Sequence, residues 1–296
     1  MIVGTLLGLV VWAATRRGRD PLRGRLRWLA VAAGLLPVLV TVFYAVAGII
    51  PALLAALTPD VFFMLWETRF VAPLVAGLAS LALLTVPGPA SSPIPFAAVA
   101  RRTAFTYVGK GWLVTAVALI AVTVALSVAA GMASTVDEEG RYTMFSFNIG
   151  TFTVSTTIYG WHYSLPALAL VLALAGCGWA ALAFVARSPL SEPWEHQAST
   201  RRTRSRNIAV AITAALSLHL GLILGSLAGT STLQGGMPTD SAGDITVQAP
   251  FAALTPLLSA SSFVFAAVGI ALWLSVTLTA VPVPGRVRRT TSALAS

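Results

Sequence analysis

The chain has 296 residues, of which 57% are hydrophobic and only 10% are charged, and its mean hydropathy is +0.84. Soluble domains carry about 25% charged residues, so this composition excludes an ordinary water-soluble protein. The net charge of +9 does not indicate nucleic-acid binding, because the basic residues lie in short segments between apolar blocks, as in membrane proteins. A single cysteine, Cys177, excludes an intrachain disulfide and a cysteine-based zinc cluster.

The apolar blocks have about the length that a helix needs to cross a membrane, which is ~20 residues. We expect an all-α integral membrane protein, a single polytopic domain with about seven transmembrane helices. In chain order the predicted spans lie near residues 2–15, 28–50, 65–87, 112–134, 162–186, 207–229 and 254–281. The count becomes six or eight if the short first block or the stretch 51–63 is assigned differently.

The distribution of charged residues predicts the orientation in the membrane. The segments that hold 17 of the 19 basic residues are 16–27, 88–111, 187–206 and 282–296. By the positive-inside rule these segments face the cytoplasm, which puts the N-terminus outside and the C-terminus inside. Arginine greatly outnumbers lysine, which is typical of a GC-rich bacterial genome. We therefore expect a multi-pass protein of a bacterial cytoplasmic membrane.

Two segments between predicted spans are long enough to fold on the outer side, and we expect them to form a small extracytoplasmic cap. Residues 135–161 are rich in Thr, Phe, Tyr and Val around Asn148, a composition typical of a β-hairpin. Residues 230–251 form a loop rich in Gly, Ser and Asp with one short candidate strand, Ile245–Gln248.

The stretch 51–66 predicts a short helix along the outer membrane surface, with Asp60 capping its second half. Glu67 and Arg69 follow it and are expected to anchor the next span at the interface. Several carboxylates on the same side, together with His162, have oxygen and nitrogen atoms of the kind that bind divalent cations. These acids are Asp137, Glu138, Glu139, Asp240 and Asp244. Adjacent acids in a loop are more often simply solvated, so we expect no bound metal.

The run ALSLHLGLILGSLAG, residues 215–229, combines a histidine with small residues at every fourth position. The small residues are Ser217, Gly221, Gly225 and Gly229. They lie on one face of a helix and let a neighbouring backbone approach closely, so they predict tight helix packing. His219 is two residues from Gly221, about 200° around the helix, and faces away from them. A helix that buries two opposite faces belongs in the middle of the bundle.

His219 lies near mid-membrane, about 18 Å from the cytoplasmic end of its predicted span. An ionisable group at this depth is a candidate for proton or substrate contact. A neutral histidine can instead donate a hydrogen bond to a hydroxyl or a backbone carbonyl of a neighbouring helix, and we favour this structural role. Because His162 lies at the outer end of its predicted span and His196 lies in a cytoplasmic loop, a haem held by two histidines is not expected, nor is any other cofactor.

The sequence offers little for catalysis. Lys110 lacks the flanking Gly and Ser/Thr of a phosphate loop, and the motifs HExxH and GxSxG are absent. We expect the basic segment 187–206 to be an ordinary connector. The alternative is a short amphipathic helix around Glu192–Ala198 that docks a cytoplasmic partner, by analogy with permease subunits that work with a separate ATPase. The candidate docking residues are Glu192, Trp194, Arg201 and Arg202.

These features favour a permease-type subunit of a transport system that a separate partner energises, since the chain has no ATP site of its own. The alternative is an accessory or sensory membrane subunit without transport or catalytic activity, which acts by assembly with other membrane proteins. Sparse polar groups inside the predicted spans favour this second interpretation. The expected partners are the lipid bilayer and either a cytoplasmic ATPase or other membrane subunits, and not nucleic acid.

Overall fold

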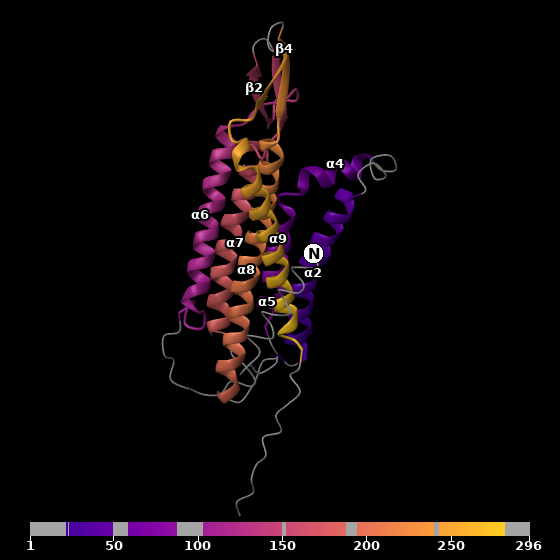
Figure 1. The fold of residues 1–296 in the computed structure, drawn as a ribbon. Helices are drawn as coiled ribbons and strands as arrows, with labels where there is room; N and C mark the ends of the chain where they lie inside the picture. The colour runs from indigo at the N-terminus through magenta and orange to yellow at the C-terminus, as the bar shows by residue number, and fades with distance from the viewer. Residues whose placement is uncertain are drawn as a thin grey trace, which may run out of the picture.

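Long helices form a bundle, and small β-sheets stand at one of its ends, which we call the sheet end (Figure 1). The structure, a computed structural model, describes residues 22, 24–49, 59–87, 103–149, 152–187, 194–239 and 243–281. The helices are α2 (Gly24–Ile49), α4 (Pro59–Thr68), α5 (Ala72–Thr85), α6 (Lys110–Met132), α7 (Trp161–Arg187), α8 (Trp194–Ser231), the short 3-10 helix η1 (Ala252–Leu254) and α9 (Thr255–Leu278). The first predicted span, 2–15, lies outside the described residues.

Five helices of the described part are long and apolar enough to cross a membrane, and the bent pair α4–α5 makes a sixth if it counts as one span. Their outward faces expose large apolar side chains, such as Val114 on α6, Leu172 on α7 and Phe263 on α9. Water-soluble proteins rarely expose extended apolar surface, whereas lipid acyl chains accept it. The protein is therefore an all-α, multi-pass membrane protein, with small sheets added at one end.

Helix α8 occupies the centre of the bundle. Of its most apolar 18-residue stretch, 89% is buried by the rest of the protein, compared with 22% to 39% in the other four long helices. It packs against α9, α5, α6 and α7 (Figure 1). Ser217 and His219, which lie on different faces of α8, are both buried. The central position predicted for this helix agrees with the burial of both faces.

The small residues of α8 approach α9 at two points. A Cβ atom added to Gly221 would lie 3.1 Å from both Ala266 N and Ser262 O. One added to Gly225 would lie 3.0 Å from Ser262 Oγ, and this hydroxyl donates a hydrogen bond to Gly221 O at 2.8 Å. A Cβ at Gly229 would meet no atom within 4 Å. Among these glycines, Gly221 and Gly225 therefore pack closely against α9, and Gly229 does not.

The third predicted span is not one helix. The sequence predicts an uninterrupted span over 65–87, but the chain bends by 74° between α4 and α5. A backbone hydrogen bond from Val71 N to Thr68 O closes the turn at 3.1 Å. Pro73 is the second residue of α5. Proline has no N–H to donate, but an N–H at this position would have no hydrogen-bond partner within the helix, so the proline is tolerated there. Hydropathy does not reveal this bend, because apolar residues continue on both sides of it.

Helix α8 begins at Trp194, well before the start predicted for its span at residue 207. Residues 194–206 of the basic segment are therefore helical where we expected a connector. Arg204 is buried, and its Nη2 donates hydrogen bonds to Leu84 O at 3.0 Å and Val86 O at 2.9 Å, at the end of α5. The last carbonyls of a helix have no partner within the helix, so Arg204 supplies one.

Arg201 has the same role for α7. It is buried, and its Nη1 donates to Val185 O at 3.0 Å and also to Ala186 O, in the last turn of that helix. A positive charge at a helix C-terminus is also favoured by the helix dipole. These contacts explain why a charged segment continues an apolar helix: Arg201 and Arg204 bond to the ends of neighbouring helices.

In the described part of the chain, five strands form two small antiparallel sheets at the sheet end. They are β1 (Thr135–Val136), β2 (Tyr142–Ile149), β3 (Phe152–Thr157), β4 (Gln234–Thr239) and β5 (Gly243–Gln248). β2 and β3 pair as a hairpin within residues 135–161, where the sequence predicts one. β5 contains the candidate strand Ile245–Gln248, but β4, its partner, is not expected from the sequence. A side chain at Gly235 of β4 would collide with Ile149 and Val154, so the two sheets pack against each other.

Replacing Gly221 with leucine should destabilise the protein, because the new side chain does not fit between α8 and α9. Overpacking of a tight contact costs about 1–3 kcal/mol. The measurement is the free energy of unfolding of the purified protein in detergent micelles, followed by circular dichroism. Gly229→Leu is the matched control, since nothing lies within 4 Å of its Cβ position. An equal loss in both variants would contradict the packing role of Gly221.

Candidate functional site

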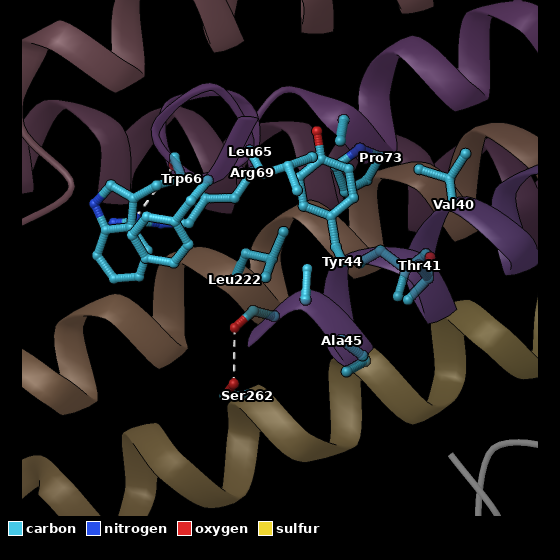
Figure 2. Close-up of a pocket in the computed structure, with 16 residues that line it drawn as sticks. Val40, Thr41, Tyr44, Ala45, Leu65, Trp66, Arg69, Pro73, Leu222 and Ser262 are labelled. Carbon is cyan, nitrogen blue, oxygen red and sulfur yellow. Dashed lines mark hydrogen bonds between the residues drawn. The ribbon is translucent and has the colours of Figure 1, made fainter. Parts of the chain in front are cut away.

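A cavity of about 360 Å³ lies between α2 and α4 on one side and α8 and α9 on the other (Figure 2). Its volume falls in the range of about 300–1,000 Å³ that is usual for small-molecule sites. The walls are mostly apolar. They include Val40 and Ala45 of α2, Leu65 of α4, Pro73 of α5 and Leu222 of α8. We call this space the apolar cavity.

The apolar cavity exists because α2 diverges from α9 toward the sheet end (Figure 1). The two helices are in close contact at Gly34, where an added Cβ would lie 2.8 Å from Trp273 O. Pro37 interrupts the hydrogen bonding of α2 one turn later. Near the sheet end, Tyr44 Oη forms a hydrogen bond with Thr68 Oγ1 at 2.8 Å, which ties α2 to α4 instead of α9.

A second cavity of about 410 Å³ adjoins the first and reaches the β-sheets. Both cavities are lined by Trp66, Arg69, Gly221, Leu222 and Ser262. The second is more polar, and we call it the polar cavity; its hydroxyl groups come from Thr156, Thr157, Ser226, Thr230 and Ser262. Gly225 and Gly229 also line it. The glycines of α8 thus leave room for a cavity in addition to allowing close packing.

Arg69 lies in the turn between α4 and α5 and lines both cavities. Its Cζ is 3.5 Å from the centroid of the Trp66 ring and 4.6 Å from that of Phe70. Its Nη1 donates a hydrogen bond to Trp66 O at 3.2 Å. Arg69 takes part in no ion pair among the described residues, and its other N–H groups have no hydrogen-bond partner there. The rings hold the guanidinium in place and leave most of its donors open.

His219 lies on another face of α8 and contacts the same turn. Its Nδ1 is 2.8 Å from Phe70 O, and because a carbonyl only accepts, Nδ1 carries the hydrogen. Nε2 then accepts a longer hydrogen bond of 3.4 Å from Tyr159 Oη. Phe70 O belongs to the turn, where a carbonyl needs a partner from outside the helix. These contacts support the structural role of His219 that the sequence favours.

Charged side chains connect the sheets to the helices at the sheet end. Arg141 contacts Asp137 Oδ2 at 3.0 Å, Glu139 Oε2 at 3.0 Å and Glu67 Oε1 at 3.6 Å. His162 Nε2 lies 3.0 Å from Glu67 Oε2. Three carboxylates of this side are therefore engaged by a basic side chain. Among the described residues no group of three or more His, Cys, Asp or Glu side chains is arranged to hold a metal ion.

The predicted docking residues do not form one surface in the described part of the chain. Arg202 is exposed, whereas Arg201 is buried against the end of α7. Glu192 lies outside the described residues, and of Trp194 only the backbone is described. The sequence interpretation also missed Arg69 as a possible ligand contact. The available signal was its position between Trp66 and the helix-starting Pro73.

Comparisons with known protein families, with curated proteins and with solved structures find no match for this chain. The function of the site is therefore inferred from its chemistry. The site combines an apolar cavity within the helices, a polar cavity beside the sheets and one arginine between them.

Replacing His219 with alanine should lower the free energy of unfolding by about 1–2 kcal/mol. Interhelical hydrogen bonds in membranes average about 0.6 kcal/mol, but an unpaired buried carbonyl adds a cost of about 1–3 kcal/mol. His219→Asn, whose amide can still donate to Phe70 O, should lose less, and Tyr159→Phe should lose least. Unfolding in mixed micelles measures all three. A stable His219→Ala protein that loses a pH-dependent activity would show a functional histidine instead.

Asp137 should stabilise the β1–β2 region above about pH 4 and lose this effect as the pH falls toward 2. Burial raises the pKa of Asp137, but hydrogen bonds from Thr143 Oγ1, Arg141 N and Arg141 Nε outweigh it and lower the pKa to about 2. Because the unfolded pKa is about 3.9, folding favours the carboxylate and stability declines between these values. Hydrogen exchange of β2 amides, corrected for intrinsic rates, should show this decline.

The matched variant for this test is Glu138→Gln, which changes the neighbouring exposed carboxylate. Asp137→Asn should reduce the protection of β2 amides at neutral pH and remove their dependence on acid. Glu138→Gln should keep both. Identical acid profiles for Asp137→Asn and the unmodified protein would show that Asp137 does not stabilise this region.

Proposed function

We propose that this protein is a permease-type subunit of a transport system in a bacterial cytoplasmic membrane, and that the two adjoining cavities form its substrate site. The broken pair α4–α5 carries this proposal. Transporters often build substrate sites from discontinuous helices, with the N-terminus of a half-helix at the site. Here Ala72 and Pro73, at the start of α5, line the apolar cavity together with Arg69.

The proposal includes seven spans. The described part supplies six if α4–α5 counts as one, and the predicted span 2–15 would be the seventh. An N-terminus outside and a C-terminus inside follow from the positive-inside rule. In this orientation the exposed Arg202 and Lys110 lie on the cytoplasmic side, and the β-sheets form an extracytoplasmic cap. Both cavities would then lie toward the outer side of the membrane.

An accessory or sensory subunit is the second candidate, and the contacts of α8 favour it. Polar side chains of α8 such as His219, Arg201 and Arg204 bond to backbone carbonyls of neighbouring segments. Such contacts stabilise one arrangement of the helices, whereas transport requires two. In this interpretation the packed sheets at the sheet end would receive a signal or bind another subunit.

Co-purification from native membranes separates the two candidates. A permease-type subunit should bring down a cytoplasmic ATPase, and the charge reversal Arg202→Glu should lower the recovery of that ATPase about fivefold, as expected for a loss of about 1 kcal/mol. Arg25→Glu is the matched control, because Arg25 is also exposed at the end of the bundle opposite the sheets, but on α2.

Recovery of a stable complex without an ATPase would contradict the permease proposal and favour the accessory subunit. If an ATPase is recovered equally with Arg202→Glu and with the unmodified protein, the permease interpretation stands but the proposed docking position is wrong. Quantitative mass spectrometry of the purified complexes distinguishes these results.

A further inference from the structure

We propose that the two cavities bind one anionic phospholipid, with its phosphate on Arg69 and one acyl chain in the apolar cavity. This inference rests on the proposed function in one respect, since it names the substrate class of that site. The binding itself requires only this chain. Charge, shape and access to the membrane each contribute to the argument.

The charge of the site favours an anionic group. Arg69 offers a planar set of donors, of which only Nη1 has a hydrogen-bond partner among the described residues, Trp66 O. Guanidinium groups bind phosphate through two parallel hydrogen bonds. Stacking on the Trp66 and Phe70 rings holds the side chain, so that little conformational entropy is lost when the anion binds. The nearby N-terminus of α5 adds a partial positive charge.

The same residues disfavour a zwitterionic headgroup. No aspartate or glutamate is among the residues that line either cavity in the described part of the chain. An ammonium or choline group would therefore find no carboxylate to pair with. The polar cavity instead offers hydroxyl groups, including those of Ser226 and Thr230. Uncharged, hydrogen-bonding headgroups such as glycerol suit these groups.

The apolar cavity is accessible to an acyl chain from the membrane. Leu222 belongs to the central helix α8, yet 38% of its surface is exposed, because α2 diverges from α9 beside it. Ala45 on the opposite wall is also exposed. Figure 2 shows Leu222, Ala45 and Tyr44 around the same space, which the hydroxyl of Ser262 borders on the α9 side. Of the hydroxyls in these walls, those of Thr41, Tyr44 and Ser262 already have hydrogen-bond partners.

The test uses the purified full-length protein in detergent, titrated with dioleoyl phosphatidylglycerol or dioleoyl phosphatidylcholine. Native mass spectrometry measures the fraction of protein that retains one lipid. We expect a preference for phosphatidylglycerol, and Arg69→Gln should weaken its binding about tenfold, the effect of losing a charge-assisted pair of hydrogen bonds. Arg69→Lys, which keeps the charge without the planar fork, should have an intermediate effect. Phosphatidylcholine has the same phosphate but should lose less, because removing the charge of Arg69 also removes its repulsion of the choline group.

Two further variants make the test specific. Arg202→Gln removes an exposed arginine at the opposite end of the bundle and should leave binding unchanged. Ala45→Trp fills the apolar cavity from an exposed position and should weaken both lipids, with the unfolding midpoint serving as the check on folding. Equal preference for phosphatidylglycerol with and without Arg69, or unchanged binding by a folded Ala45→Trp variant, would overturn the proposal.

Soluble glycerol phosphate distinguishes a lipid from a free anion. If it competes at the same concentrations as the lipid, the acyl chain contributes nothing and the lipid proposal is wrong. These measurements involve no partner protein, so their failure is separable from that of the proposed function. Lipid bound by a chain that recovers no ATPase would support this inference and refute the permease proposal.

Discussion

A helix inside a hydrocarbon layer cannot leave its terminal carbonyl groups without a partner, because no water reaches them. The broken pair α4–α5 creates this problem after the end of α4 and again at the end of α5, and α8 solves it at both places. His219 donates to Phe70 O before α5, and Arg204 donates to Leu84 O near its end. The two side chains are 15 positions apart on α8, about 22 Å, which matches the length of about 21 Å of the 14-residue helix α5. Helix α8 therefore holds the short helix α5 in place through these two hydrogen bonds.

The same constraint applies to α2, whose divergence from α9 opens the cavity. Pro37 cannot donate to Ala33 O, and Ser80 Oγ of α5 donates to this carbonyl instead, at 2.8 Å. With the carbonyl satisfied, α2 can diverge from α9 in its second half and follow α4 through the bond between Tyr44 and Thr68. The cavity thus depends on hydrogen bonds to α5 and α4, and α5 in turn depends on α8.

Hydropathy predicts helices that cross the membrane without interruption, and it predicts them well here. Helices α6 and α7 run from Lys110 to Met132 and from Trp161 to Arg187, close to the predicted 112–134 and 162–186. Hydropathy fails where polar side chains bond to other segments of the chain. The arginines at the start of α8 resemble a solvated connector in the sequence. The turn at Arg69 lies within a continuous apolar block. The cavities are equally hidden, because they result from the divergence of two helices that are distant in sequence.

The buried polar side chains of this protein differ in how many of their hydrogen-bonding atoms have a partner, and this difference indicates the candidate site. His219 uses both ring nitrogens, and Arg204 donates to two carbonyls of one helix end. These groups stabilise the fold and have a fixed partner. Arg69 is held mainly by aromatic rings, which orient a guanidinium but do not occupy its N–H donors. Arg69 is therefore a half-buried cation with open donors between two cavities, and these donors are available for a ligand.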